Sequence, residues 1–278
     1  MENEIIELKC EFGICRISLV GAQVTSWIPS GGDEVLFMPA DTPWGAEVHG
    51  GIPLCWPWYG KSAAPGRSAH GIARYVTWTV EEQTDENVRL VLSSSDETRR
   101  IWPHDFRLSY KVSMGRNSLV CCLSATNVGS APFAASDAFH PYFSVRDIEE
   151  CHVDGDPDFV TRPAHLSRYL PGDVASRVLS GAGIASAVRI SGKGHSGWWY
   201  WNSGEDQTPT IASLASDDWR RFVCVEPVTR DFYRLGSGET RTIEMKLEII
   251  KGVYEPGTDH ATSAEVPLPP DSLRLYVY

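Results

Sequence analysis

Apolar and polar residues alternate along several short stretches of this chain, and that two-residue period constrains the fold more than any other feature. In TRTIEMKLEII, residues 240–250, the apolar side chains of Ile243, Met245 and Leu247 share one face and polar side chains lie between them. The stretch NVRLVLSSS, residues 87–95, shows the same alternation. Because successive side chains of a strand point to opposite faces, both stretches are predicted to be β-strands with one buried face.

Further stretches of strand length complete an all-β pattern. SLVCCLSATN at 118–127 is predicted to be a more buried strand, because its apolar residues are nearly continuous. Other runs of strand length are found at 14–21, 75–83, 106–114, 187–192 and 221–228. Turn residues such as SGG, MGRN and GSGE separate the runs, and no amphipathic helix longer than two turns is expected. Many short strands with frequent turns favour a β-sandwich or barrel.

The length of 278 residues allows this architecture to form one domain, which we predict to span residues 1–252. The tail, residues 253–278, differs in composition. It contains VPLPP, which disfavours both helix and central strand, followed by LRLYVY, which has the composition of a strand. We expect it to be packed at an edge or partly disordered, and a strand-adding or dimer-contacting tail is the alternative.

Charge and cysteine content limit the class of partner. The net charge of −11 argues against nucleic acid and anionic membranes, because their phosphate groups select basic surfaces. The first residues, MENEIIELKCEFG, lack the features of a signal peptide, and no apolar run approaches the ~18 residues of a membrane span, so a cytoplasmic location is expected. The seven cysteines form no CxxC pair, which predicts reduced thiols and neither a disulfide framework nor a zinc site.

A non-periodic segment at residues 46–74, AEVHGGIPLCWPWYGKSAAPGRSAHGIAR, concentrates aromatic and cationic side chains. Trp58 and Tyr59 are flat faces of the kind that stack on a sugar ring, and His70 and Arg74 supply hydrogen-bond donors four residues apart. The segment is therefore a candidate sugar-binding wall. A buried aromatic cluster under a long loop is the alternative.

Two titratable residues elsewhere could carry acid–base chemistry. His140 lies in the apolar stretch SDAFHPYFSVRDI, and a histidine near its usual pKa exchanges protons well at neutral pH. Glu226 ends the apolar run in RRFVCVEPV, and a carboxylate there must be paired or functional. The alternatives are a hydrogen-bonded core histidine and a salt bridge from Glu226 to Arg220, Arg221 or Arg230.

Several of these motifs, taken together and in this order, resemble the hexose-6-phosphate mutarotase family, a branch of the aldose 1-epimerase and galactose mutarotase-like proteins. The motifs are GGIPLCWPWYG, HGIARYVTW, NVGSAPF, FHPYFSVRDI, YWN and VCVEP. The resemblance covers about residues 20–250 and implies a large antiparallel β-sandwich, the supersandwich. It also implies interconversion of sugar anomers without a cofactor or metal.

The resemblance also assigns roles to residues of this chain. It implies that Glu226 is the catalytic base and His140 the acid, and that His70, Arg74 and Asn202 contact the substrate. Opening a hemiacetal ring needs one base at the C1 hydroxyl and one acid at the ring oxygen, which agrees with the two residues identified above.

The sequence departs from the family where a phosphate would bind. His49 replaces the arginine that usually precedes GGIP, which leaves Arg74 as one guanidinium where the family has two. We therefore expect a hexose or hexose 6-phosphate as substrate, with His49 near its far end. A non-catalytic carbohydrate-binding module on the same fold is the alternative, and a polysaccharide hydrolase or lyase is a third hypothesis. The oligomeric state is left open.

Overall fold

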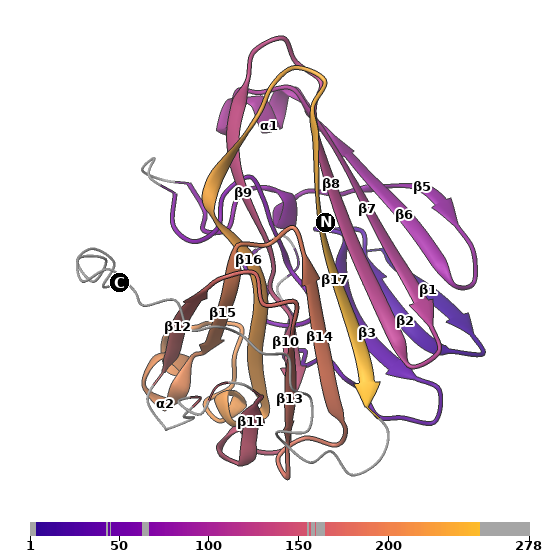
Figure 1. Ribbon diagram of the computed structural model, residues 1–278, viewed down its shortest axis with the longest axis vertical. Helices are drawn as coiled ribbons and strands as arrows, with labels where there is room; N and C mark the ends of the chain where they lie inside the picture. The colour runs from indigo at the N-terminus through magenta and orange to yellow at the C-terminus, as the bar shows by residue number, and fades with distance from the viewer. Residues whose placement is uncertain are drawn as a thin grey trace.

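Antiparallel β-strands dominate the computed structural model, which describes residues 4–42, 44, 46–62, 67–154, 156, 159 and 165–250 (Figure 1). These residues form three sheets, of eight, six and three strands. Every strand pairing within the sheets is antiparallel.

The largest sheet has eight strands in the order β11-β13-β14-β17-β8-β7-β6-β5. Its strands are β5 (Thr79–Gln83), β6 (Asn87–Ser93), β7 (Phe106–Gly115), β8 (Ser118–Asn127), β11 (Cys151–Val153), β13 (Ser176–Gly181), β14 (Ala187–Lys193) and β17 (Thr240–Ile250). The alternation predicted at 87–95 and 240–250 is confirmed, since Leu90, Ile243 and Leu247 are buried and polar residues separate them.

The six-stranded sheet has the order β12-β15-β16-β9-β4, and β10 also pairs with β16. Its strands are β4 (Leu54–Cys55), β9 (Phe133–Phe139), β10 (Tyr142–Ser144), β12 (Leu166–Pro171), β15 (Gly197–Asn202) and β16 (Phe222–Leu235). Strand β16 is the longest strand of this sheet and contacts three neighbours. It therefore holds the centre of the sheet.

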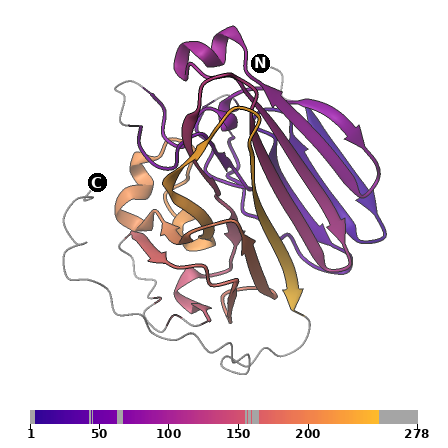
Figure 2. The ribbon, with the colours of Figure 1, turned by 45° about the horizontal axis from the view of Figure 1, so that its top comes forward.

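The remaining elements are short. The three-stranded sheet consists of β1 (Ile5–Cys10), β2 (Gly13–Ser18) and β3 (Gln23–Pro29), and Figure 2 shows these indigo strands alongside the large sheet. The helices are α1 (Asp96–Ile101), α2 (Gly204–Gln207) and the 3-10 turns η1 (Ala73–Tyr75), η2 (Ile148–Glu150), η3 (Thr208–Thr210) and η4 (Asp218–Arg221). The prediction that no helix exceeds two turns is confirmed for the described residues.

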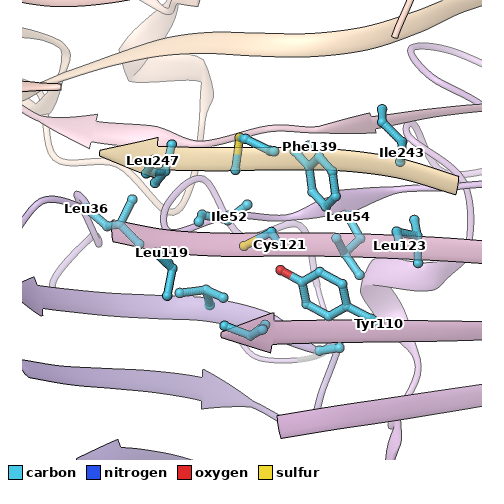
Figure 3. Close-up of a cluster of buried hydrophobic side chains, with 14 of the residues drawn as sticks. Leu36, Ile52, Leu54, Tyr110, Leu119, Cys121, Leu123, Phe139, Ile243 and Leu247 are labelled. Atoms are coloured by element: carbon cyan, nitrogen blue, oxygen red, sulfur yellow. The ribbon is translucent and has the colours of Figure 1, made fainter. Parts of the chain in front are cut away.

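The core lies between the two larger sheets. Tyr110, Cys121 and Leu247 of the eight-stranded sheet face Leu54 and Phe139 of the six-stranded sheet (Figure 3). One continuous cluster of buried side chains extends into the three-stranded sheet as well. The predicted all-β antiparallel sandwich is therefore confirmed.

Two predictions about individual strands are wrong. Strand β8 buries only alternate residues, and Cys122 on its outer face is partly exposed, because that face of the sheet meets solvent. Strand β5 begins at Thr79, and the preceding residues of the run 75–83 form part of η1 and a loop. All seven cysteines are free, and five of them are buried.

The C-terminal boundary and tail are not tested, because residues 251–278 lie outside the described part. Within the described part, each helix is too short and too polar to cross a membrane.

Candidate active site

Strand β16 presents different side chains to the two faces of the six-stranded sheet. Val223 and Val225 belong to the main core, whereas Cys224 and Glu226 point to the opposite, outward face. Glu226 is nevertheless fully buried, at 0% exposure, because aromatic side chains and the loop after β4 cover this face. Trp199 of the neighbouring strand β15 pairs directly with Glu226. The outward face of this sheet is therefore the location of the candidate site.

His140 reaches the same face from the end of β9, the other neighbour of β16. Its backbone N–H donates to the carbonyl of Pro53 at 3.1 Å, and its ring stacks on Tyr142 with the ring centroids 4.9 Å apart. Its Nδ1 lies 3.6 Å from Oε1 of Glu226, which is too long for a good hydrogen bond. Both atoms are buried and have no hydrogen-bond partner among the described residues. The structure therefore brings the two predicted catalytic residues together with one free atom on each.

Tyr59 fixes the other oxygen of the glutamate. Its hydroxyl donates to Oε2 of Glu226 at 3.1 Å, and its backbone N–H donates to the hydroxyl of Ser136 at 2.9 Å. Its ring lies 5.7 Å from that of Trp199. Tyr59 thus orients the carboxylate and leaves Oε1 directed toward His140.

A tight turn delivers His70 to the site. His70 has a φ of 61°, and at the following Gly71 an added Cβ would lie 2.0 Å from the carbonyl oxygen of Trp56, so only glycine fits there. The backbone N–H of Gly60 donates to Nδ1 of His70 at 3.3 Å, so the neutral ring carries its proton on Nε2. With its ring centroid 5.3 Å from that of His140, His70 is a hydrogen-bond donor beside the catalytic pair.

Burial moves the pKa values of the catalytic pair in opposite directions. Desolvation raises the pKa of Glu226 well above its usual value, and the Tyr59 hydrogen bond and the charge of Arg74 oppose that rise. Desolvation lowers the pKa of His140 well below its usual value, and the neighbouring His70, Arg74 and His49 lower it further. The neutral forms of both groups are therefore favoured, and such opposed shifts are typical of acid–base sites.

His49 lies near the aromatic side chains of the site. Its Nδ1 is 3.0 Å from the hydroxyl of Ser213, and its ring centroid lies 6.4 Å from that of Tyr142 and 6.1 Å from that of Trp201. Burial, assisted by the charge of Arg74, lowers the pKa of His49 to about 4. The ring is therefore neutral at pH 7.

Arg74 is buried behind these histidines, with only 2% of its side chain exposed. Its Nη2 donates to the backbone carbonyl of Val48 at 2.7 Å, and its Nη1 lies 3.7 Å from a carboxylate oxygen of Glu47. Its guanidinium therefore anchors the segment that carries His49, and its charge lowers the pKa of His49, of His70 and of His140. Direct substrate contact by Arg74 stays a prediction.

The structure does not bring Trp58 and Asn202 to the outward face. Trp58 packs in the main core, and its Nε1 donates to the carbonyl of Ser68 at 3.1 Å. Asn202 lies on the core side of β15, where its Nδ2 donates to the carbonyls of Trp219 and Phe222 and its Oδ1 accepts from an N–H of the following turn. The geometry gives both residues structural tasks.

The predicted salt-bridge alternative for Glu226 is wrong. Arg220 lies 3.0 Å from Glu149, and Arg221 pairs with Asp218. Arg230 covers the ring of Tyr169, with its guanidinium carbon 4.9 Å from the ring centroid. All three arginines are engaged away from Glu226.

Sequence reasoning missed several residues of this face. Trp199 and Trp201 of β15, Tyr142 of β10 and Cys224 of β16 surround the catalytic pair. Alternation in GWWYWN, residues 197–202, was a usable signal, because it places Trp199 and Trp201 on the face opposite the residues between them.

A cavity of about 680 Å³ lies elsewhere, between the ends of β3, β13 and β17. Its lining includes Pro29, Asn117, Ser180, Ala185 and Ile249. Among the described residues, its lining contains no titratable side chain and none of the predicted site residues, so it does not compete with the outward face as a catalytic site.

Comparisons with known proteins identify a family for this chain. The family described as aldose 1-epimerase matches residues 5–169. A Salmonella typhimurium protein provisionally assigned as a glucose-6-phosphate 1-epimerase is 32% identical over 234 residues, which cover 76% of this chain and 78% of the relative. An Escherichia coli K12 protein with the same assignment is 31% identical over 232 residues, which cover 75% of this chain and 77% of the relative.

Solved structures of related proteins have a similar fold. A crystal structure of a Salmonella typhimurium protein provisionally assigned as a mutarotase superposes with a TM-score of 0.81 at 28% identity, covering 90% of this chain and 92% of that one. An Escherichia coli K12 structure provisionally assigned as an aldose 1-epimerase superposes with a TM-score of 0.73, covering 90% of this chain and 99% of that one. Its identity is 14%, so it supports the fold alone.

Proposed function

The chain belongs to the aldose 1-epimerase family, and we propose that Glu226 and His140 interconvert the α and β anomers of a hexose by opening and reclosing its ring. The chain is an isomerase of the mutarotase type. The observation that carries the assignment of the pair is the 3.6 Å separation between two buried atoms, Nδ1 of His140 and Oε1 of Glu226, that lack hydrogen-bond partners among the described residues.

The reaction needs one proton removed and one proton supplied. Glu226 takes the proton from the C1 hydroxyl while protonated His140 gives its proton to the ring oxygen, and the bond between C1 and the ring oxygen breaks. The open aldehyde rotates about its C1–C2 bond, and the reverse transfers close the ring on either face. Each positioned group is expected to accelerate the reaction by about 10²–10⁴-fold.

Burial assists the opening step. Opening converts the charged pair, carboxylate and imidazolium, into the neutral pair, carboxylic acid and imidazole. Desolvation favours the neutral form of both Glu226 and His140, so the charged pair is the minor form of the free site. Once the charged pair has formed, the same desolvation favours the direction in which the ring opens. The hydrogen bond from Tyr59 and the charge of Arg74 act against this shift and keep the carboxylate form accessible.

The neighbouring side chains support substrate orientation. Tyr59 holds Oε2 of Glu226, so the free Oε1 is the atom that would receive the C1 proton. The Nε2 proton of His70 is a donor for a sugar oxygen, and the half-buried rings of Trp199 and Trp201 offer faces for the sugar ring.

For the substrate, we propose an unphosphorylated hexose. The relatives carry the name glucose-6-phosphate 1-epimerase, which makes the 6-phosphate the alternative. In this chain His49 is neutral at pH 7, and the guanidinium of Arg74 is already bound to Val48 and lies near Glu47. A neutral imidazole paired with the Ser213 hydroxyl suits a sugar hydroxyl better than a dianionic phosphate.

The chemistry of the chain also supports a small-molecule partner in a reducing compartment. Seven free cysteines are typical of cytoplasmic proteins, so we propose the cytoplasm as its location. The net charge of −11 supports the absence of a nucleic-acid partner.

The decisive experiment is NMR exchange spectroscopy of anomer interconversion with glucose, galactose and glucose 6-phosphate at equal concentration. We expect enhanced exchange of a neutral hexose, and loss of that enhancement in Glu226→Gln but not in the surface variant Glu248→Gln. Enhancement confined to the 6-phosphate would overturn the substrate proposal and leave the mechanism intact. Full activity of Glu226→Gln would remove Glu226 from the mechanism.

The non-catalytic binding module is not favoured, because the family is one of isomerases and both proposed acid–base residues are present, Glu226 on β16 and His140 directly after its neighbour β9. Sugar binding by the wild type without accelerated exchange of any of the three sugars would restore that alternative.

A further inference from the structure

Cys224 adds a third donor atom to the catalytic pair. It precedes Glu226 by two residues on β16, so strand periodicity directs both side chains to the same face. The thiol sulfur of Cys224, a ring nitrogen of His140 and a carboxylate oxygen of Glu226 all lie within 4.8 Å of one another. All three residues are buried, and the mechanism proposed above does not use the thiol.

This donor set suits a soft divalent cation. Zinc binds sulfur at about 2.3 Å and nitrogen or oxygen at about 2.0–2.2 Å in a tetrahedron, which places its ligand atoms roughly 3.3–3.8 Å apart. The separation of 3.6 Å between Nδ1 of His140 and Oε1 of Glu226 is close to the roughly 3.3–3.5 Å expected of a nitrogen–oxygen ligand pair. Neither atom has a hydrogen-bond partner among the described residues, so a cation would not have to displace one.

We propose that His140, Cys224 and Glu226 form a binding site for Zn²⁺ or a similarly thiophilic divalent cation, and that the bound cation reversibly inhibits the enzyme. Three protein ligands leave a fourth position for water or a sugar hydroxyl. Binding exchanges the thiol proton of Cys224 for the metal, together with the carboxyl proton of Glu226 where that group is protonated, and both protons are released to solvent. Magnesium and calcium, which require more oxygen ligands, are excluded by the same donor set.

Inhibition follows because the cation occupies the two atoms that exchange protons with the sugar. A metal-bound Glu226 cannot take the C1 proton, and a metal-bound His140 cannot return one. The inhibition rests on the proposed function, whereas the cation site itself does not.

Cobalt binding can be measured by absorption spectroscopy, so the cation site can be tested without an assay of enzyme activity. We would titrate the metal-free protein with Co²⁺, follow the near-ultraviolet band of a thiolate bound to cobalt, and displace the cobalt with Zn²⁺. We expect one cobalt per chain with that band, and at least a tenfold weaker affinity in Cys224→Ala. The matched control is Cys121→Ala, which removes a thiol buried in the main core and should leave the titration unchanged. Absence of the band in folded wild type would overturn the site.

Anomer exchange then tests the inhibition. Zn²⁺ should suppress exchange in the wild type and in Cys121→Ala, and chelation with EDTA should restore it. The exchange activity that Cys224→Ala retains should resist Zn²⁺, with Cys224→Ser as a second variant if the alanine variant does not fold. Equal zinc sensitivity of wild type and a folded Cys224 variant would refute the inhibitory role. If no sugar reacts, the proposed function fails and the cobalt titration still decides the site.

Discussion

The two large sheets both have a face directed away from the core, and these two faces differ in how their polar groups are satisfied. On the eight-stranded sheet, Ser124 and Thr242 share a hydrogen bond of 2.8 Å across neighbouring strands, and Lys193 lies 2.7 Å from Glu244. On the six-stranded sheet, Glu226 and His140 are buried and each keeps one atom without a hydrogen-bond partner among the described residues.

This difference separates a solvent-exposed surface from the proposed reaction site. Polar groups that pair with their cross-strand neighbours or with water have no need of a ligand. A buried carboxylate and imidazole left half-paired cost stability, and such groups persist in native proteins where function requires them. The comparison predicts that substitutions at Glu226 lower activity without loss of stability, whereas substitutions on the outward face of the eight-stranded sheet change neither activity nor stability.

The largest effect is expected from Glu226→Gln. Loss of the base should lower the rate of anomer exchange by about 10²–10⁴-fold. The free energy of unfolding at pH 8 should stay level or rise, because the raised pKa of Glu226 reports an unfavourable buried charge. Urea unfolding monitored by fluorescence measures the second quantity. A clear loss of stability would mean that the glutamate supports the fold and would contradict the comparison.

On the core side of the same sheet, a substitution is expected to lower stability and to leave the rate of anomer exchange nearly unchanged. Asn202→Ala leaves two carbonyls and one N–H of the adjoining turns without their partner, which should cost about 2–4 kcal/mol of stability. Exchange per folded molecule should change less than twofold. A loss of exchange with unchanged stability would instead make Asn202 a substrate ligand.

His49 is expected to make the free energy of unfolding depend on pH. Its pKa falls from 6.5 in the unfolded chain to about 4 in the folded one, so below pH 6.5 only the unfolded state takes up a proton there. Stability supplied by His49 is therefore complete above pH 6.5 and falls with decreasing pH, by up to about 1.4 kcal/mol per pH unit, until the folded ring also titrates near pH 4.

The variant His49→Gln isolates this contribution. Thermal unfolding between pH 7 and pH 4 should show a shallower decline than in the wild type, while His70, His140 and Glu226 continue to titrate in both proteins. Parallel curves for the two proteins would show that His49 is not held neutral by the fold.

The smallest effect belongs to the outward face of the eight-stranded sheet. Ser124→Ala removes one exposed hydrogen bond to Thr242, and stability should change by less than about 0.5 kcal/mol with no change in exchange rate. Denaturation and NMR exchange of this variant set the baseline for the other three. A large change in stability or exchange rate for Ser124→Ala would contradict the proposed difference between the outward faces of the two sheets.

Much of the fold could be predicted from sequence, because a strand with one buried face shows alternating apolar and polar residues in the sequence. The stretch 240–250 shows it clearly, and the structure buries the residues expected. Strand β8 was predicted less well, because Val120 and Cys122 on its outer face are apolar residues that meet solvent. Composition alone does not distinguish a half-exposed apolar residue from a buried one.

The site was predictable only in part. His140 and Glu226 stand out because each is polar within an apolar run, and the structure places them side by side. The roles of Trp58 and Asn202 depend on which face of the chain meets the core, and the contact between Tyr59 and Glu226 joins residues 167 positions apart. Such long-range contacts follow from sheet pairing, which single-sequence patterns do not specify.

The pairing of β9 with β16 has a consequence for how this scaffold can diversify. The proposed base, Glu226, lies on β16, and the proposed acid, His140, directly follows β9. The spacing of these two strands, about 4.8 Å, is set by backbone hydrogen bonds. By contrast, His49, Tyr59 and His70 come from the connecting segment before and after β4. The spacing of the proposed catalytic pair is thus encoded mainly in the strands. A lineage, or a designer, can exchange the residues around His49 and His70 for a new sugar while retaining the same proton-transfer distance, provided that Tyr59 is kept to hold Glu226.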